Sequence, residues 1–238
     1  MLLVAVVNHE HTAGAAALVR GFAPHADVLA IDSGSKLAEG ERDLFALRLP
    51  NVYYSGLINA ACEAASGMPD KEVLYFICSD VAVDDCGRAA ELARRAFADP
   101  RLGLYAPSAN ESGHPQMLHR GSGGLRPAAF VEGFCFAVRL SLLAQMCPVD
   151  VSVNRLGWGL DKYLGYLALR AGLETAVDDR LTVRHRGICG YSTREARQQH
   201  DAWFAGRSRA ARRFQALSSV SWCKTNPGLR LLKALPWS

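Results

Sequence analysis

The stretch EVLYFICSDVAVDD, residues 72 to 85, holds the most strand-like segment of the chain. Residues 72 to 78 are predicted to form a fully buried strand, because an apolar run of this length is typical of parallel sheets. The run ends on Ser79 and Asp80. The Asp80 carboxylate is either a turn residue before the next helix or a ligand for Mg²⁺ or Mn²⁺, which prefer oxygen ligands. The thiol of Cys78 is a poor ligand for such a hard cation.

Short apolar runs alternate with helix-like stretches around this segment over the first 105 residues. This alternation predicts parallel strands covered by helices. In such sheets ligands bind beyond the carboxyl ends of the strands, where Asn8, Asp32 and Asp80 fall. The other strands are expected at residues 2–7 and 27–32, and the helices at residues 12–22, 55–66 with Ser55 as N-cap, and 88–98.

The pattern changes in the second half of the chain. Residues 108–128 are rich in glycine, serine and proline and contain two histidines. A loop of this length is typically a lid, a binding loop or a disordered segment. Regular structure is expected again at residues 129–138, followed by helices at residues 140–146 and 161–171, the second of which ends at Gly172.

Composition narrows the class of protein. The chain has 238 residues and a net charge of +4, which suits one substantial core. Its seven cysteines are scattered singly, which argues against a disulfide framework or a zinc knuckle and favours a reducing cytoplasm. The apolar opening MLLVAVV lacks a preceding basic stretch and meets polar residues at once, so neither a signal peptide nor a spanning helix is expected.

Three further segments carry residue types suited to chemistry. Asp32, in the segment IDSGS, could bind a ribose or a base, or could simply form a turn. In GWGLD, residues 157 to 161, Trp158 could stack on a sugar and Asp161 could act as a general base; a core tryptophan beside an N-cap aspartate fits equally. His185 ends a strand-like stretch, where it could bind a metal or have a structural role.

The order of these segments resembles that of the family-two glycosyltransferases of the GT-A fold, especially the bacterial rhamnosyltransferase-like enzymes. The resemblance runs from Leu2 to about Ser192, and no single motif carries it. The matching segments are VAVVNHE, AIDSGS, NVYYSGLINAACEAA, YFICSDVAVDD, DPRLGLYAPSAN, EGFCFAVR, GWGLDKYLGYLALRAG and RHRGICGYS.

The resemblance implies an α/β fold of the GT-A type, with a mostly parallel central sheet flanked by helices. Residues 1–192 would form the glycosyltransferase domain, with residues 1–105 as its nucleotide-sugar-binding half and residues 106–192 as its acceptor-side half. Residues 193–238 would form a basic, partly amphipathic C-terminal tail.

The resemblance also implies roles for individual residues. Two positions depart from the family pattern: Cys78 stands where many members have the first acid of the metal motif, and Leu160 stands where a glutamate usually precedes the catalytic aspartate. The implied roles are donor binding by Asn8, Asp32, Asn59 and Ser79, binding of Mg²⁺ or Mn²⁺ by Asp80 and His185, general-base catalysis by Asp161, and acceptor binding by Glu132, Gly133 and Trp158.

The implied activity is transfer of a hexose or deoxyhexose from a nucleoside diphosphate sugar to a hydroxyl of a glycan or lipid-linked acceptor. The transfer would invert the configuration at the anomeric carbon and would serve polysaccharide biosynthesis. Two alternatives stay open. A sugar nucleotidyltransferase would share the alternating core but should carry a glycine-rich basic loop after the first strand, where NHEHTAG is a poor match. A catalytically silent nucleotide-sugar-binding module is compatible with Cys78 and Leu160.

The tail carries the basic charge of the chain. From Arg194 onward there are nine lysines or arginines against two acids, mixed with leucines, Phe214 and Trp237. Such a segment either lies on a membrane surface or docks as helices on its own domain. A cytoplasmic protein, with peripheral contact to the inner membrane face, is compatible with the first alternative. No nucleic-acid-binding fold is indicated.

Overall fold

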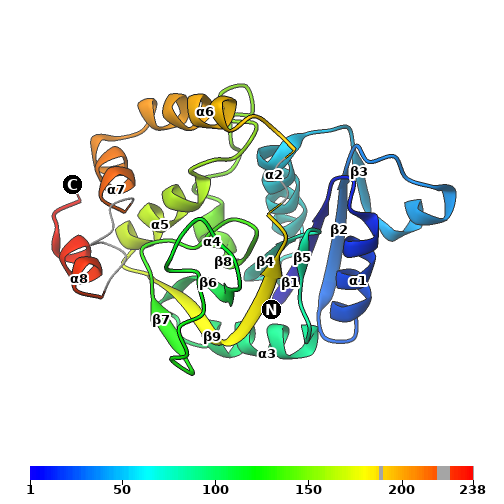
Figure 1. Cartoon of the computed structure of the whole chain (residues 1–238), viewed down its shortest axis with the longest axis horizontal. Helices are drawn as coiled ribbons and strands as arrows, with labels where there is room; N and C mark the ends of the chain where they lie inside the picture. The colour runs from blue at the N-terminus through cyan, green and yellow to red at the C-terminus, as the bar shows by residue number, and fades with distance from the viewer. Residues whose placement is uncertain (188–189, 219–225, 238) are drawn as a thin grey trace.

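The computed structural model describes residues 1–187, 190–218 and 226–237. Its first half alternates strands and helices around one edge of a central sheet (Figure 1). The elements are β1 (Leu2–Asn8), α1 (Thr12–Phe22), β2 (Asp27–Ser33), the 3-10 helix η1 (Glu39–Leu44), β3 (Leu47–Leu49), α2 (Tyr53–Ser66) and β4 (Val73–Cys78).

The parallel half of the sheet is built as expected from the apolar runs. Strands β3, β2, β1 and β4 lie side by side in this order and all pair in parallel. The register places Asn8 opposite Asp32, and Val7 opposite Cys78. The carboxyl ends of β1, β2 and β4 therefore meet at one edge, so that polar residues from distant parts of the sequence lie near one another.

The second half of the chain extends the same sheet and adds the C-terminal helices. A further strand, β7 (Leu125–Pro127), pairs with β9 (Glu174–His185) but lies outside the continuous order of strands in the sheet. The elements are β5 (Val81–Ala82), α3 (Cys86–Phe97), β6 (Leu102–Ala109), β7 (Leu125–Pro127), β8 (Cys135–Arg139), α4 (Leu140–Leu143), α5 (Leu160–Arg170), β9 (Glu174–His185), α6 (Thr193–Ala205), α7 (Arg209–Ser218) and α8 (Asn226–Ala234).

The sheet is mixed rather than mostly parallel. Strand β8 lies between β4 and β6 and is antiparallel to both, while β5 and β7 are antiparallel to β9. The long connection after β6 stays at the end of the sheet where β6 finishes, so β8 starts there and runs antiparallel to β6. An apolar run indicates that a strand is buried but does not indicate its direction. The antiparallel direction of β8 could therefore not be predicted from the sequence.

Several element boundaries differ from the sequence-based expectation. Helix α2 begins at Tyr53 with Val52 at the N-cap, so Ser55 is not the cap. The hydroxyl of Ser55 is used elsewhere, because it donates to the carbonyl of Asn154 at 2.5 Å. Asp85 caps α3 by accepting a hydrogen bond from the N–H of Arg88. The helix expected at residues 140–146 is short, and the loop expected at residues 108–128 includes the end of β6 and all of β7.

The core lies on both sides of the sheet. Strands β1 and β4 are buried along almost their whole length, and α1 packs against β1, β2 and α3. Helix α2 packs against β1, β2, β4 and α4, and α5 packs against β6 and β9. Helices from both halves of the chain therefore cover the sheet.

The C-terminal helices dock on the rest of the chain. Trp203 and Phe204 of α6 belong to the main core, while Phe214 of α7 packs with Leu229 of α8 against Tyr166 of α5. The apolar side chains of the tail are thus largely packed against the rest of the protein, as expected if the tail docks as helices on its own domain. Among the described residues, no helix is long and apolar enough to cross a membrane.

A buried ion pair anchors the loop between β6 and β7. The guanidinium of Arg126 donates to both carboxylate oxygens of Asp179 at 2.9 and 3.0 Å, and the N–H groups of Arg120 and Ser122 donate to Oδ2. Burial by itself raises the pKa of Asp179, but the hydrogen bonds from Arg126 and Ser122 outweigh it and lower the pKa to about 2. The folded state therefore prefers the ionised carboxylate.

We expect the Asp179→Asn variant to unfold about 2 kcal/mol more easily than the wild type at pH 7. The folded-state pKa of Asp179 is depressed, so its contribution is complete above the unfolded pKa near 4 and is lost as pH falls toward about 2. Urea unfolding of both proteins from pH 7 to pH 3 should show the difference shrinking only below pH 4.

Asp99 provides the matched control for this prediction. Its hydrogen bonds from Arg101 also lower its pKa to about 2, but its side chain is 43% exposed. Solvent screens such pairs, so Asp99→Asn should change stability little at any pH. Equal losses for the two variants would contradict the role given to burial at Asp179.

Candidate functional site

Asn8, Asp32 and Ser35 form a hydrogen-bonded cluster at the ends of β1 and β2. Nδ2 of Asn8 donates to Oδ1 of Asp32 at 2.8 Å, and the N–H of Ser35 donates to Oδ2 at 3.0 Å. The hydroxyl of Ser35 also donates to Oδ1 at 2.5 Å. Asp32 is buried, so its carboxylate fixes the two loops that follow these strands. Two of the expected donor residues are thereby brought together.

Asp80 and His185 lie side by side although 105 residues separate them in the chain. Oδ2 of Asp80 is 3.3 Å from Nε2 of His185, and the two side chains are 15% and 18% exposed. The short antiparallel pairing of β5 with β9 creates this contact, because Val81 lies opposite His185. The imidazole is further fixed by stacking on Phe134, with ring centroids 4.0 Å apart. The expected pair of metal ligands is thus adjacent and partly open to solvent.

The chemistry of this pair fits a divalent cation such as Mn²⁺ or Mg²⁺. The two atoms that lie 3.3 Å apart are a carboxylate oxygen and an imidazole nitrogen, both of which bind divalent cations. Burial and the charge of Asp80 raise the pKa of the Cys78 thiol, which disfavours the thiolate needed for metal binding. The described part of the chain contains no cluster of three or more metal-binding side chains. A cation here would therefore need further oxygen ligands from a bound molecule.

Asp161 is placed by a tightly ordered turn before α5. Gly157 and Gly159 have positive φ angles of 76° and 88°, which favour glycine. The buried side chain of Asn154 organises the turn, because it accepts from the N–H of Gly157 at 2.9 Å and donates to the carbonyl of Trp158 at 3.0 Å. Asp161 then falls in the first turn of α5, where the helix dipole favours a carboxylate.

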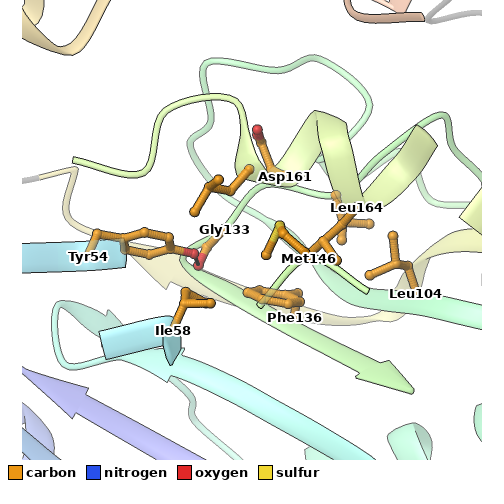
Figure 2. A pocket seen from close by; sticks show the side chains of 10 residues that line it. Tyr54, Ile58, Leu104, Gly133, Phe136, Met146, Asp161 and Leu164 are labelled. Carbon is orange, nitrogen blue, oxygen red and sulfur yellow. Dashed lines mark hydrogen bonds between the residues drawn. The ribbon is translucent and has the colours of Figure 1, made fainter. Parts of the chain in front are cut away.

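Asp161 borders a small, mainly apolar pocket with a cavity volume of about 10 Å³, which is partly open to solvent. Figure 2 shows Asp161 at the start of α5, above Tyr54 and Gly133. The N–H of Lys162 donates to Oδ1 of Asp161 at 2.8 Å. The pocket is lined by Tyr54, Ile58, Leu104, Val131, Gly133, Phe136, Met146, Leu160, Asp161 and Leu164.

Tyr54 connects three segments beneath this pocket. Its hydroxyl donates to the carbonyl of Gly133 at 2.7 Å, and a Cβ on Gly133 would lie 2.3 Å from the same hydroxyl. A Cβ on Gly157 would lie 2.2 Å from the Tyr54 ring. Burial raises the pKa of Tyr54 well above its ordinary value, so the phenol stays protonated and keeps this hydrogen bond. Gly133 and Gly157 thus give Tyr54 the space it occupies.

We expect Gly157→Ala to destabilise the protein by about 3 kcal/mol, since it adds both a steric clash and an unfavourable φ angle. For a chain of this size, this corresponds to a fall in Tm of roughly 6–12 °C. Gly40→Ala is the control, because a Cβ at Gly40 meets no atom within 4 Å. Similar Tm values for the two variants in thermal unfolding would contradict the packing described for Tyr54.

Glu132 and the segment from Ser112 to His114 lie on the other side of Asp161. The hydroxyl of Ser112 donates to Oε2 of Glu132, and the N–H of His114 donates to Oγ of Ser112 at 2.9 Å. Nε2 of His114 is 4.0 Å from Oδ2 of Asp161. The pKa of Glu132 is raised, first by burial and then by the charge of Asp161, despite the hydrogen bond from Ser112. Ser112 and His114 were not predicted, because a glycine-rich loop gives no periodicity that would orient its side chains.

Trp158 has an aromatic neighbour. Its indole N–H donates to the hydroxyl of Tyr191 at 2.8 Å, and the two rings meet edge to face with centroids 6.5 Å apart. Tyr191 is exposed and Trp158 is half-buried. Trp158 is therefore not a core residue, and its role in acceptor binding stays a prediction.

Asn59 and Ser79 have structural contacts. Nδ2 of Asn59 donates to the carbonyl of Val149 at 2.9 Å, and Oδ1 accepts from the N–H of the same residue at 2.7 Å. Both polar ends of this amide are thus used to tie α2 to the segment after α4, which leaves them unavailable for the donor in this conformation. Ser79 is buried, and its N–H donates to the carbonyl of Val7 at 2.9 Å.

Helix α6 supports the turn that precedes Asp161. Oε1 of Gln199 accepts from the N–H of Leu156 at 3.0 Å, and Arg155 forms an ion pair with Glu195 at 2.6 Å. A Cβ on Gly159 would lie 2.6 Å from the ring of His200. Sequence reasoning missed these contacts, because they connect a polar loop to a helix that was assigned to the tail. The domain boundary at residues 192 and 193 stays a prediction.

Comparison with solved structures identifies the fold. GalNAc-T7 with UDP, GalNAc and Mn²⁺ has a TM-score of 0.65 and 12% identity, over 100% of this chain and 52% of that one. A mannosyltransferase from Pyrobaculum calidifontis in complex with GDP-Man and Mn²⁺ has a TM-score of 0.57 and 12% identity, over 98% and 84%. A mycobacterial protein has a TM-score of 0.58 and 14% identity, over 86% and 74%.

These likenesses show that the chain has the GT-A fold, which confirms the fold expected from the sequence. The chain spans about half the length of the GalNAc-T7 chain. No protein-family model and no curated protein sequence matches it. The comparison therefore shows the architecture of the chain.

Proposed function

We propose that this protein is an inverting glycosyltransferase that moves a sugar from a nucleoside diphosphate sugar to a hydroxyl of a glycan or lipid-linked acceptor. The observation that carries the proposal is the 3.3 Å contact between Asp80 and His185 at the carboxyl edge of a GT-A sheet. Ligands of α/β sheets bind at this edge. The contact joins two side chains of the type that binds divalent cations, from segments far apart in the sequence.

The donor is proposed to bind across the ends of β1, β2 and β4. Asn8 and Asp32 would order the loops around the nucleoside, with Ser79 in the neighbouring segment. Asp80 and His185 would hold Mg²⁺ or Mn²⁺, which would neutralise the charge on the diphosphate leaving group. Two of the similar structures contain a nucleotide or nucleotide sugar together with Mn²⁺, which supports this class of donor.

Asp161 is proposed to be the general base. Its Oδ1 is held by the N–H of Lys162, so that Oδ2 can accept the proton of an acceptor hydroxyl. The hydroxyl oxygen would attack the anomeric carbon from the face opposite the diphosphate, in a single displacement without a covalent enzyme intermediate. Glu132, Gly133 and Trp158 would line the acceptor side, where Gly133 and Asp161 border the same pocket.

A hexose or deoxyhexose donor and a role in polysaccharide biosynthesis complete the proposal. The exposed arginines of α7, at positions 209, 212 and 213, would favour contact with an anionic membrane face in the cytoplasm. This placement is compatible with a lipid-linked acceptor. The apolar residues that pack on α5 would stay in the core in that arrangement.

The proposal is tested by binding and turnover of donors. A thermal-shift panel of UDP-, GDP-, dTDP- and CDP-sugars, each with and without Mn²⁺, should raise Tm for one nucleotide class only when the metal is present. The selected donor should then be hydrolysed slowly without an acceptor. Absence of any metal-dependent shift would contradict the proposal, whereas a shift without hydrolysis or transfer to any acceptor would favour a silent binding module.

A further inference from the structure

A second carboxylate lies beside Asp161 and comes from a different part of the chain. Leu160 directly precedes Asp161, and its side chain is buried and uncharged. Glu132 instead approaches from the segment before β8. It is linked to Asp161 through Ser112 and His114, whose contacts join the two carboxylates across one small region.

Several observations show that Glu132 is held in place rather than free in solvent. The hydroxyl of Ser112 donates to Oε2, and Oε1 lies 4.0 Å from the position of a Cβ on Gly113. The N–H of Glu132 points at the sulfur of Met117, at 3.4 Å. The loop between β6 and β7, anchored at its far end by Asp179 and Arg126, therefore wraps around this carboxylate.

The two carboxylates are close enough to interact electrostatically. The charge of Asp161 contributes to the raised pKa of Glu132, after the larger effect of burial, and the charge of His185 opposes it. The imidazole of His114 lies 4.0 Å from Oδ2 of Asp161, and the Lys162 ammonium lies over the ring of Phe130. An acceptor entering this region would meet two negative charges.

We propose that Glu132 is a specificity-determining residue that makes the acceptor subsite select neutral hydroxyl or amine groups and reject acceptors with a carboxylate or phosphate next to the reacting hydroxyl. This rests on the proposed function, since it concerns the acceptor of that reaction. Carboxylates accept hydrogen bonds from sugar hydroxyls, whereas a like charge at close range is repelled. Specificity of this kind depends on the repulsive element as much as on the attractive one.

The test compares matched neutral and anionic sugars. Methyl glucoside and methyl glucuronide, and methyl galactoside and methyl galacturonide, differ within each pair only at C6. Their affinities for the full chain would be measured by saturation-transfer NMR in the presence of Mn²⁺ and UDP or GDP. We expect the neutral member of at least one pair to bind about tenfold more tightly to the wild type, and Glu132→Gln to reduce this ratio to about threefold or less.

Glu111→Gln is the matched control, because it removes one negative charge from an exposed position next to Ser112. It should leave the ratio unchanged. Ser112→Ala is a second variant, which keeps the charge of Glu132 but removes its hydrogen bond, and should weaken binding of the neutral sugar while retaining rejection of the anionic one.

The outcomes separate this inference from the proposed function. An unchanged ratio in a folded Glu132→Gln protein, equal binding of both sugars to the wild type, or no binding of any neutral sugar would overturn the inference. Failure of UDP and GDP to bind with Mn²⁺, together with a preserved preference for neutral sugars, would instead overturn the proposed donor chemistry. Tm values within about 2 °C of the wild type would show that the variants are folded.

Discussion

The Asp161→Asn variant is expected to lose sugar transfer by about a thousandfold, since general-base catalysis contributes about 10²–10⁴ to rates. An amide has no basic oxygen for the acceptor proton, but its carbonyl can still accept the hydrogen bond from Lys162. The turn organised by Asn154 should therefore persist. Initial rates at saturating donor and acceptor measure the loss.

Donor binding separates this prediction from a general loss of structure. Affinity for the nucleotide and Mn²⁺ should stay within about twofold of the wild type, since Asp161 is proposed to act on the acceptor. Asp43→Asn, at an exposed position in η1, should leave both rate and affinity unchanged. Retained turnover in Asp161→Asn would remove this residue from the role of base, and would direct attention to Glu132.

The second large effect is expected at the pair of Asp80 and His185. Asp80→Ala should weaken Mn²⁺-dependent nucleotide binding by about 30- to 100-fold, because one of the two proposed metal ligands and its negative charge are removed. Calorimetric titration of the nucleotide with and without Mn²⁺ would show whether the metal still increases affinity. We expect this increase to disappear, while the weak metal-independent binding remains.

Asp84 offers a close control for Asp80. It follows β5, the short strand that Asp80 precedes, and its carboxylate pairs with Arg184, the neighbour of His185 on β9. Both members of that pair are exposed, so Asp84→Ala removes the same charge without touching the proposed ligand pair. Equal losses of Mn²⁺-dependent binding in the two variants would show that local charge, rather than coordination by Asp80, governs nucleotide affinity.

The sequence predicted the first half of the fold well, because its strands are apolar runs and its helices carry regular apolar faces. Helix α1 matches its expected bounds, and Asn8 and Asp32 lie together because parallel register carries strand ends to one edge. The antiparallel insertion of β8 was not predicted, since residues buried in parallel and antiparallel strands look alike in sequence.

The site was predicted unevenly for a similar reason. The adjacency of Asp80 and His185 agrees with the expectation carried by the resemblance to a known family. Asn59 was expected at the donor, but both polar atoms of its amide form hydrogen bonds with the backbone of Val149. No local sequence pattern indicates such a long-range contact. Ser112, His114 and Gln199 were missed because loop and tail residues gain their roles only from tertiary contacts.

The support of the Asp161 turn by α6 has a consequence for biosynthesis. The hydrogen bond from Leu156 to Gln199 spans 43 residues, and the ion pair of Arg155 with Glu195 spans 40. During translation, the turn that carries Asp161 leaves the ribosome well before the helix that secures it, since synthesis proceeds from the N-terminus. The nascent chain can therefore complete its sheet before α6 forms these contacts with the turn. The turn that carries Asp161 therefore reaches its final form late, once α6 has emerged and docked.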